Sequence, residues 1–385
     1  MDLTIQQGDL AFAVGRALGS VQQKAANPLL NCVLLEADAD KGGLRVTGTD
    51  LDVTTSILVP CTVRTPGRAA VGARHFNEVI RKMPKGAISL AQVGNQVEVR
   101  YGDGKGWSRF LQQNGDEFPR VPELKGDPHV SLAGEALSRM VERTSYASSD
   151  EPARPQLNGV FVQGTDKQVT FVATDGHRLS RTSQKGAYGD LASDGIIVPS
   201  RVLNSVSKVA QEATSPVEVR VAEGKNHIGF FTQVGEYQVQ VYARLVEGAY
   251  PNYEQVIPKD NPRELVCVRS DIMEAVDIVA SHADTNTMQI RFSLRGGKFS
   301  VSSATVDFGA GEQSVDAQYK GEDMEIGYNA KYLLQILRSI PTENVLFRLK
   351  TALSAGVIEP VGALPNADED MLCLIMPLRL PDAVG

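Results

Sequence analysis

The sequence predicts an α+β fold in which three similar domains follow one another, each with two helices packed on antiparallel sheets. The first observation is an amphipathic helix that occurs three times, within residues 71–83, 198–209 and 326–340. In each copy apolar residues recur at helical spacing on one face, and two basic residues seven positions apart occupy the opposite face. These basic pairs are Arg74 and Arg81, Arg201 and Lys208, and Lys331 and Arg338.

The second observation is that the order helix, strands, helix, strands repeats with the same period. The three basic pairs are offset by about 127 and about 130 residues, a period far longer than the roughly 20 to 50 residues of solenoid repeats. A chain of 385 residues is also too long for one ordinary core. We therefore predict three complete domains, over residues 1–127, 128–258 and 259–385.

The first repeat begins with a short strand and a helix over residues 1–18, for which Asp9 is a candidate N-cap. Alternating strands precede the helix of 71–83. Residues 97–110 then form a hairpin. Its GDGKGW turn lacks the spacing of a phosphate-binding loop.

The second and third repeats follow the same order. Helices are expected near 131–146 and 264–279, strands near 157–183 and 290–306, and a final strand pair closes on MLCLIMPLRL. The segments GDEFPRVPEL at 115–124 and GAYPNYEQVIP at 248–258 resemble each other at corresponding places. The polar loop 361–370 is predicted to be a surface excursion.

Composition narrows the class of protein. With 42% hydrophobic and 22% charged residues the chain is typical of soluble globular proteins. It has no apolar run near the roughly 18 residues of a membrane helix and no signal segment, so we expect a cytoplasmic protein. Its four cysteines show no metal-ligand spacing and are expected to be reduced and mostly buried.

The net charge of −7 argues against a general nucleic-acid coat. If the three basic helices face a common axis, they form a positive lining inside an acidic shell.

Two further stretches are candidates for function. ATDGHRLS at 173–180 offers Asp175 and His177 as an acid–base pair, but the turn at Gly176 disrupts that geometry and no nucleophile accompanies it. A loop anchored by hydrogen bonds, or a partner-binding edge, is favoured. The C-terminal residues 372–380 are either a final core strand or, because of Pro377, an exposed apolar edge suited to docking peptides.

The sequence resembles the bacterial DNA polymerase III beta subunit, the sliding clamp of the replicase, over essentially its whole length. The motifs that carry the resemblance are GTDLD at 48–52, VGARHF at 71–76, LNG at 157–159, ATDGHRL at 173–179, YPNY at 250–253 and MPLRL at 376–380. The resemblance implies three DNA-clamp domains per chain and a ring-shaped head-to-tail homodimer around double-stranded DNA. Phe110 is implied to belong to the dimer contact.

The resemblance further implies a processivity factor that slides without reading sequence and has no catalytic centre, metal or cofactor. DNA contact is expected through phosphates. With the basic helices included, the expected DNA-binding residues are Lys24, Arg74, Arg81, Arg154, Gln156, Arg201, Lys208, Lys331 and Arg338. The loop before Leu157 departs from the family's aromatic pattern.

The resemblance also implies a groove between the second and third domains that binds short peptides of the DNA polymerase III alpha subunit, the clamp loader, other polymerases and repair factors. The matching positions are Leu157, Thr174, Gly176, His177, Arg178, Leu179, Pro251, Val256, Met376, Pro377, Leu378, Arg379 and Leu380. Gln255 stands where an arginine is often found. Residues 381–385 extend past the usual family ending, either shading this groove or remaining a solvated tail.

Two alternatives to a sliding clamp remain open from the sequence. One is a peptide-binding scaffold that does not encircle DNA. The other is a hydrolase that uses Asp175 and His177.

Overall fold

The computed structural model describes residues 1–380 except 23, 125, 187, 189–190 and 192–193, so the predicted tail at 381–385 lies outside the described residues. The chain forms two compact units. The first comprises Met1–Ser138 and Arg201–Leu245, and the second comprises Arg139–Ser200 and the chain from Val246 onward. The boundary passes through the predicted central domain because strands of that domain pair with strands of both neighbouring domains.

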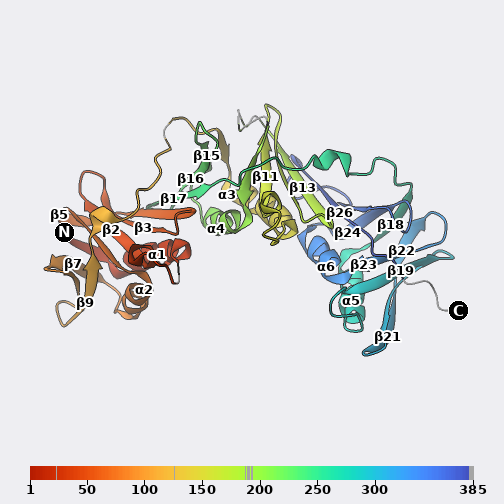
Figure 1. Cartoon of the computed structure of the whole chain (residues 1–385), viewed down its shortest axis with the longest axis horizontal. Coiled ribbons are helices and arrows are strands. Elements are labelled where there is room, and N and C mark those ends of the chain that lie inside the picture. The colour runs from red at the N-terminus through yellow and green to blue at the C-terminus, as the bar shows by residue number, and fades with distance from the viewer. Residues whose placement is uncertain (23, 125, 187, 189–190, 192–193, 381–385) are drawn as a thin grey trace. The chain divides into compact units, whose positions relative to one another are not determined.

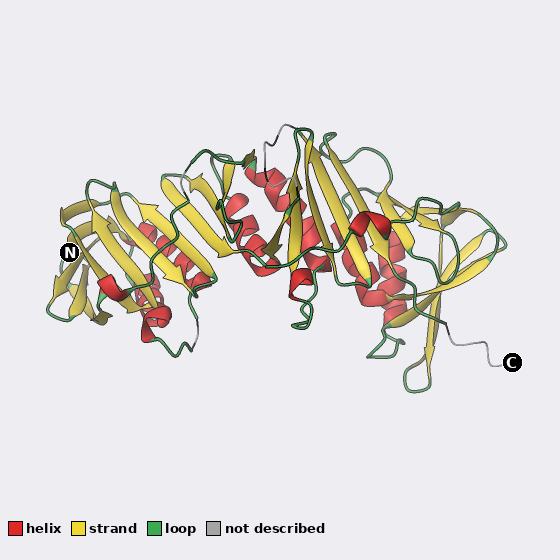
Figure 2. Cartoon of the chain, turned by 45° about the horizontal axis from the view of Figure 1, so that its top comes forward, coloured by secondary structure: helices red, strands yellow, loops and turns green. Residues whose placement is uncertain are grey.

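The first unit contains a long antiparallel sheet with helices on one face (Figures 1 and 2). Its helices are α1 (Gln7–Ala17), α2 (Ala73–Lys82), the start of α3 (Gly134–Thr144) and α4 (Ser200–Ala210). Its strands are β1 (Asp2–Gln6), β2 (Cys32–Asp38), β3 (Gly43–Thr49), β4 (Val53–Val59), β5 (Thr62–Thr65), β6 (Gly67–Gly72), β7 (Ala87–Val93), β8 (Gln96–Tyr101), β9 (Gly106–Gln113), β10 (Val130–Leu132), β15 (Val217–Val221), β16 (His227–Val234) and β17 (Tyr237–Arg244).

The second unit contains two antiparallel sheets, and its two complete helices are α5 (Arg269–Ala280) and α6 (Ala330–Ser339). The strands of its longer sheet are β11 (Gly159–Gly164), β12 (Gln168–Thr174), β13 (Arg178–Lys185), β14 (Ile196–Pro199), β18 (Arg263–Val268), β22 (Ala317–Lys320), β24 (Asn344–Leu349), β25 (Gly356–Pro360) and β26 (Glu369–Ile375). The shorter sheet consists of β19 (Gln289–Arg295), β20 (Lys298–Thr305), β21 (Gly309–Val315) and β23 (Met324–Asn329).

The long sheets of the two units repeat one strand order. In the first unit eight neighbouring strands run β6-β2-β3-β4-β17-β16-β15-β10, and in the second they run β14-β11-β12-β13-β26-β25-β24-β18. The two sheets therefore correspond strand by strand, as the sequence repeat requires. In each copy the centre of the sheet is a pairing between two domains, β4 with β17 and β13 with β26.

The predicted amphipathic helices are confirmed as α2, α4 and α6. Their apolar stripes are buried, with Phe76, Leu203 and Leu333 fully inside, and burial of each such side chain contributes about 1.5–3 kcal/mol. Helix α6 begins later than the pattern from 326 suggests. Asn329 caps it by accepting a hydrogen bond from the Tyr332 N–H at 3.0 Å, and the residues before it belong to β23.

Asp9 does not cap α1, contrary to the prediction. The helix begins at Gln7, so Asp9 lies in its first turn. The Asp9 carboxylate instead accepts a hydrogen bond from the Tyr237 hydroxyl at 2.7 Å. Burial, together with this carboxylate, raises the pKa of Tyr237 to about 12.

The prediction of a surface excursion at 361–370 is wrong at its end. Glu369 begins β26, and its side chain is completely buried between Arg139 and Arg143. Its carboxylate accepts hydrogen bonds from both arginines, at 2.7 Å and 2.5 Å. Burial by itself raises the pKa of Glu369, but the two guanidinium groups outweigh it and lower that pKa below the usual value.

Candidate functional site

The basic residues predicted on the three matching helices are all exposed. On α2, α4 and α6 the six side chains lie opposite the buried stripe, as their spacing predicts. Within the part of the chain that the structure describes, five of them have no carboxylate within ion-pair distance. These five residues are Arg74, Arg81, Lys208, Lys331 and Arg338.

Arg201 differs from the other five because two acidic residues neutralise it. Its guanidinium pairs with Asp50 at 2.9 Å and Asp52 at 3.4 Å, both in the turn between β3 and β4. DNA contact by Arg201 stays a prediction, but two carboxylates offset its charge before DNA binds. The side chain links α4 to the neighbouring turn.

The remaining predicted DNA contacts lie in loops. Lys24 is exposed before the 3-10 turn Pro28–Asn31. Arg154 is exposed and lies 3.6 Å from the Glu151 carboxylate, which offsets its charge in part. Gln156 is partly buried in the 3-10 turn Pro155–Leu157.

The turn between β12 and β13 is held by its own side chains. One Asp175 oxygen accepts hydrogen bonds from the backbone N–H groups of His177 and Arg178, at 2.9 Å and 3.0 Å. The other accepts one from Arg178 Nε at 3.0 Å. The His177 ring instead stacks on Tyr332, with ring centroids 6.3 Å apart. Asp175 and His177 thus form an anchored turn, and the acid–base interpretation is wrong.

The Arg178 side chain is turned into the protein. It is only 6% exposed, and its guanidinium lies 4.4 Å from the centre of the Tyr332 ring. It also donates hydrogen bonds to Gln335 on α6 and to the Tyr146 carbonyl. Arg178 therefore positions the turn, and the exposed residues that the turn presents are Gly176 and His177.

The other predicted pocket residues around this turn are of two kinds. Leu157 and Leu179 are buried, whereas Met376 and Val256 are 42% and 56% exposed. The Met376 N–H donates to the His177 carbonyl at 2.8 Å, and the Thr174 hydroxyl donates to the Arg178 carbonyl at 2.6 Å. The structure thus joins the turn to the segment that follows β26.

Residues after Met376 leave the long sheet and lie along β23. The Leu378 N–H donates to the Gly327 carbonyl at 2.8 Å, and Gln289 donates to the Arg379 carbonyl at 2.7 Å. Pro377 and Leu380 are partly buried there. A core strand ends at Ile375 and a partly exposed edge follows, whereas peptide docking at that edge stays a prediction.

Pro251 and Val256 belong to the loop between β17 and β18, and both are exposed. This loop is fixed by its tyrosines. Tyr250 stacks on Phe161 with centroids 5.0 Å apart, and its hydroxyl donates to the Val172 carbonyl. The loop is thereby attached to β11 and β12, beside buried Leu179.

Phe110 is not a surface residue of the subunit. It is 5% exposed, and its ring packs edge-on against Phe76 with centroids 4.8 Å apart. The exposed apolar side chains on the same strand, β9, are Trp107 and Leu111, at 57% and 69%.

The residues that hold the side chains of Arg178 and Arg201 in place were not identified from the sequence. Tyr146, Tyr332 and Gln335 surround Arg178, while Asp50 and Asp52 hold Arg201. A signal for the second set was present, because GTDLD and ATDGH share a Thr-Asp pair at corresponding positions. Asp50 accepts backbone hydrogen bonds in its turn just as Asp175 does.

The cysteines are free, as predicted, and three of the four are buried. Burial raises the pKa of the Cys267 thiol to about 12. The described residues contain no group of three or more His, Cys, Asp and Glu side chains placed to hold a metal ion. Of the helices in the described part of the chain, none is long and apolar enough to cross a membrane.

Repeated domains with matching basic helices, joined by sheets that continue across the domain boundaries, define a protein of the DNA-clamp class. Three family models match in chain order: DNA polymerase III beta subunit, N-terminal domain over residues 1–122, central domain over 131–252 and C-terminal domain over 254–379. The chain belongs to the DNA polymerase III beta subunit family. It is a sliding clamp, the non-catalytic processivity subunit of a DNA polymerase.

Relatives support this assignment over the full chain. The beta sliding clamps of Synechocystis and Pseudomonas aeruginosa are 28% and 29% identical, and each alignment covers 99% of this chain and 100% of the relative. The crystal structure of the Pseudomonas aeruginosa clamp bound to griselimycin matches with a TM-score of 0.88 and 28% identity, covering 99% of this chain and 100% of that one. The Bartonella birtlesii clamp matches with a TM-score of 0.89 and 26% identity, at the same coverage.

Proposed function

We propose that two copies of this chain form a head-to-tail ring around duplex DNA, with domains over residues 1–127, 128–258 and 259–385. The observation that carries the proposal is the matched set of exposed bases on α2, α4 and α6, which face away from the core. Lys24, Arg154 and Gln156 extend the phosphate-contacting set from their loops. Arg201 contributes little, because Asp50 and Asp52 neutralise it.

The contact between subunits is proposed to join strand edges that each chain leaves unpaired. Among the described residues, strand β21 pairs only with β20, and the part of β9 from Gly106 to Leu111 pairs only with β8. Exposed Leu111 on β9 and exposed Phe308 beside β21 supply apolar surface. When two different edges meet head to tail, the assembly closes into a ring if the rotation between neighbouring subunits brings the last subunit back to the first. Phe110 supports this edge from within the domain.

Retention on DNA tests the ring. Clamps loaded on nicked circular DNA are expected to remain bound through gel filtration in high salt and to leave once the circle is cut. Salt screens phosphate contacts but does not open a closed ring. Equal loss from circular and linear DNA would instead favour a scaffold that does not encircle DNA.

We infer that one surface of the second unit binds the clamp-binding peptides of the polymerase alpha subunit, the clamp loader and other replication and repair proteins. This surface consists of the turn Thr174–His177, Pro251, Val256 and the segment Met376–Leu380, and it lies over buried Leu157 and Leu179. The exposed apolar side chains of Val256 and Met376 support this inference. Gln255, also exposed, influences which peptides bind.

We place the protein in the cytoplasm, where bacterial chromosomes are replicated.

A polymerase-tail peptide tests this site. Met376→Ala combined with Val256→Ala should weaken peptide binding at least tenfold, as measured by fluorescence anisotropy. Val93→Ala, which also truncates an exposed apolar residue but lies in the first unit, should leave binding unchanged. Equal binding by all three proteins would place the peptide elsewhere.

A further inference from the structure

The two long sheets place corresponding residues at positions that can be compared one by one. Thr49 and Thr174 end corresponding strands, and each donates its hydroxyl to the backbone carbonyl four residues later. Leu34 lies opposite Thr47, and Phe161 lies opposite Val172, so Leu34 corresponds to Phe161. The linker segments 115–124 and 248–258 likewise align FPRV with YPNY, so Val121 corresponds to Tyr253.

In the second unit, aromatic rings fill the space between the linker and the sheet. Phe161 stacks on Tyr250 and lies 6.1 Å from Tyr253 between ring centroids. These rings cover buried Val172 and Leu374. In the second unit, protein side chains therefore fill the space between the linker and the sheet.

In the first unit, the corresponding position contains a cavity of about 580 Å³. Leu34 and Val121, which stand in for two of the aromatic residues, both line it, together with Pro122. Phe118, the counterpart of Tyr250, is buried in its own small cluster with Leu34. Leu34 and Val121 are smaller than Phe161 and Tyr253, whereas Tyr242, which also lines the cavity, replaces the smaller Leu374. The remaining volume lies within the usual range for ligand sites, about 300–1,000 Å³.

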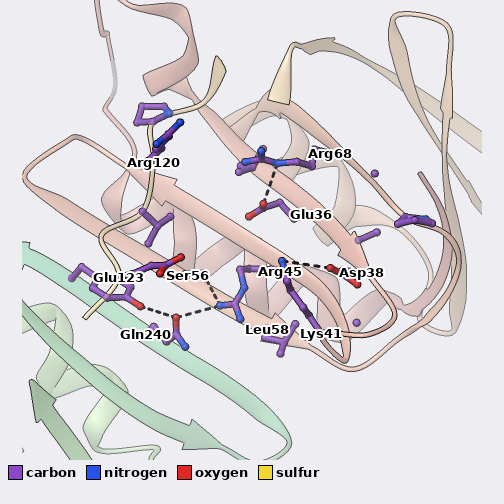
Figure 3. A pocket seen from close by; sticks show the side chains of 18 of the residues that line it. Glu36, Asp38, Lys41, Arg45, Ser56, Leu58, Arg68, Arg120, Glu123 and Gln240 are labelled. Atoms are coloured by element: carbon purple, nitrogen blue, oxygen red, sulfur yellow. Dashed lines mark hydrogen bonds and ion pairs between the residues drawn. The ribbon is translucent and has the colours of Figure 1, made fainter. Parts of the chain in front are cut away.

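One cationic side chain of this cavity, Arg45, is partly buried. Figure 3 shows Arg45 beside Ser56 and Gln240. Arg45 Nη1 donates to the Ser56 hydroxyl at 3.1 Å and to the Gln240 side-chain oxygen at 3.3 Å, both neutral acceptors. Among the described residues, no carboxylate pairs with Arg45. The counterpart of Arg45 in the second unit is Thr170, and Arg181, the counterpart of Ser56 there, is paired with Asp370 at 3.2 Å.

Most of the other charges around the cavity are already compensated. Arg68 pairs with Glu36 and Asp116, at 3.0 Å and 3.3 Å, and Lys41 pairs with Asp38 at 3.5 Å. Exposed Arg120 and Glu123 lie on the linker, one of each sign. Arg45 is therefore the partly buried cation that lacks an anionic partner.

We propose that this cavity binds an aromatic carboxylate. The ring of the ligand occupies the volume that Phe161 and Tyr253 fill in the second unit, and its carboxylate accepts hydrogen bonds from Arg45. A guanidinium presents five N–H groups in a planar fork that matches a carboxylate. The site is distinct from the proposed peptide site, whose residues all belong to the second unit.

N-acetyl-L-tyrosine is a suitable probe, because it combines the ring with the charge. Calorimetric or NMR titration of the full-length protein should show saturable binding at one site per chain. N-acetyl-L-tyrosinamide, which lacks the carboxylate, and acetate, which lacks the ring, should each bind at least tenfold more weakly. Equal binding of the amide or of acetate would overturn the proposed chemistry.

Amino-acid substitutions test whether the probe binds in this cavity. Arg45→Gln should weaken it at least tenfold, and Arg64→Gln, which alters an exposed arginine paired with Asp2, should not. Val121→Tyr restores the side chain found in the second unit and should block the cavity while the protein stays folded by circular dichroism. Undiminished binding by Arg45→Gln and Val121→Tyr, or no saturable binding to the unaltered chain, would overturn the proposal.

Discussion

At the scale of single residues, the role of a charged side chain depends on how deeply it is buried and on which oppositely charged groups contact it. Arg178 and Arg201 are both arginines next to a Thr-Asp turn, yet the first is buried among tyrosines and the second is exposed. Both are bound to aspartates that hold the turn backbone. Each arginine thus connects its turn to a neighbouring helix.

Replacement of Arg178 by methionine should destabilise the protein by about 3–5 kcal/mol, because it leaves partly buried Asp175 without its cation. Urea unfolding followed by circular dichroism measures this loss. The control is Arg154→Met, which breaks an exposed pair with Glu151 and should cost less than about 1 kcal/mol. A similar small effect for both variants would contradict a positioning role for Arg178.

The six helix bases should differ in their contribution to DNA binding. Lys208→Ala should lower the slope of log affinity against log salt by about 1, as expected for one lost phosphate contact. Arg201→Ala should change that slope by clearly less, because its charge is already matched by Asp50 and Asp52. Equal changes in titrations at several salt concentrations would mean that DNA displaces the two aspartates.

At the scale of elements, the start of β26 is fixed by a buried ion cluster. Glu369→Gln leaves buried Arg143 without its full counter-charge and should cost about 3–5 kcal/mol at neutral pH. Since the folded state lowers the pKa of Glu369, its contribution is complete above about pH 4.5 and disappears as the pH falls through the lowered value.

The unfolding free energy of the variant should therefore fall less steeply than that of the unaltered protein as the pH is lowered from 7 to 3. Chemical unfolding at a series of pH values tests this. As a control for the loss of a carboxylate, Glu151→Gln at an exposed pair should cost less than about 1 kcal/mol at neutral pH. Parallel profiles for Glu369→Gln and the unaltered chain would show that Glu369 is not the titrating group.

At the scale of the whole molecule, assembly should depend on the unpaired strand edges. Leu111→Asp places a charge on the exposed edge of β9 and should weaken dimerisation at least tenfold, as measured by analytical ultracentrifugation. Desolvation of that charge in a contact between subunits is unfavourable. Leu353→Asp, at an exposed turn outside these edges, should dimerise normally. A dimer unaffected by Leu111→Asp would place the contact elsewhere.

The three repeats, the stripes of α2, α4 and α6, and the hairpins follow from the sequence, because helical and strand periodicity depend on residues close together in the chain. Which of the predicted site residues are exposed and uncompensated depends on tertiary contacts. Arg201 is neutralised by an aspartate 151 positions away, Phe110 is covered by its own domain, and Glu369 is buried between two arginines of α3. Charge compensation and burial of this kind depend on contacts between distant segments, which no local pattern records.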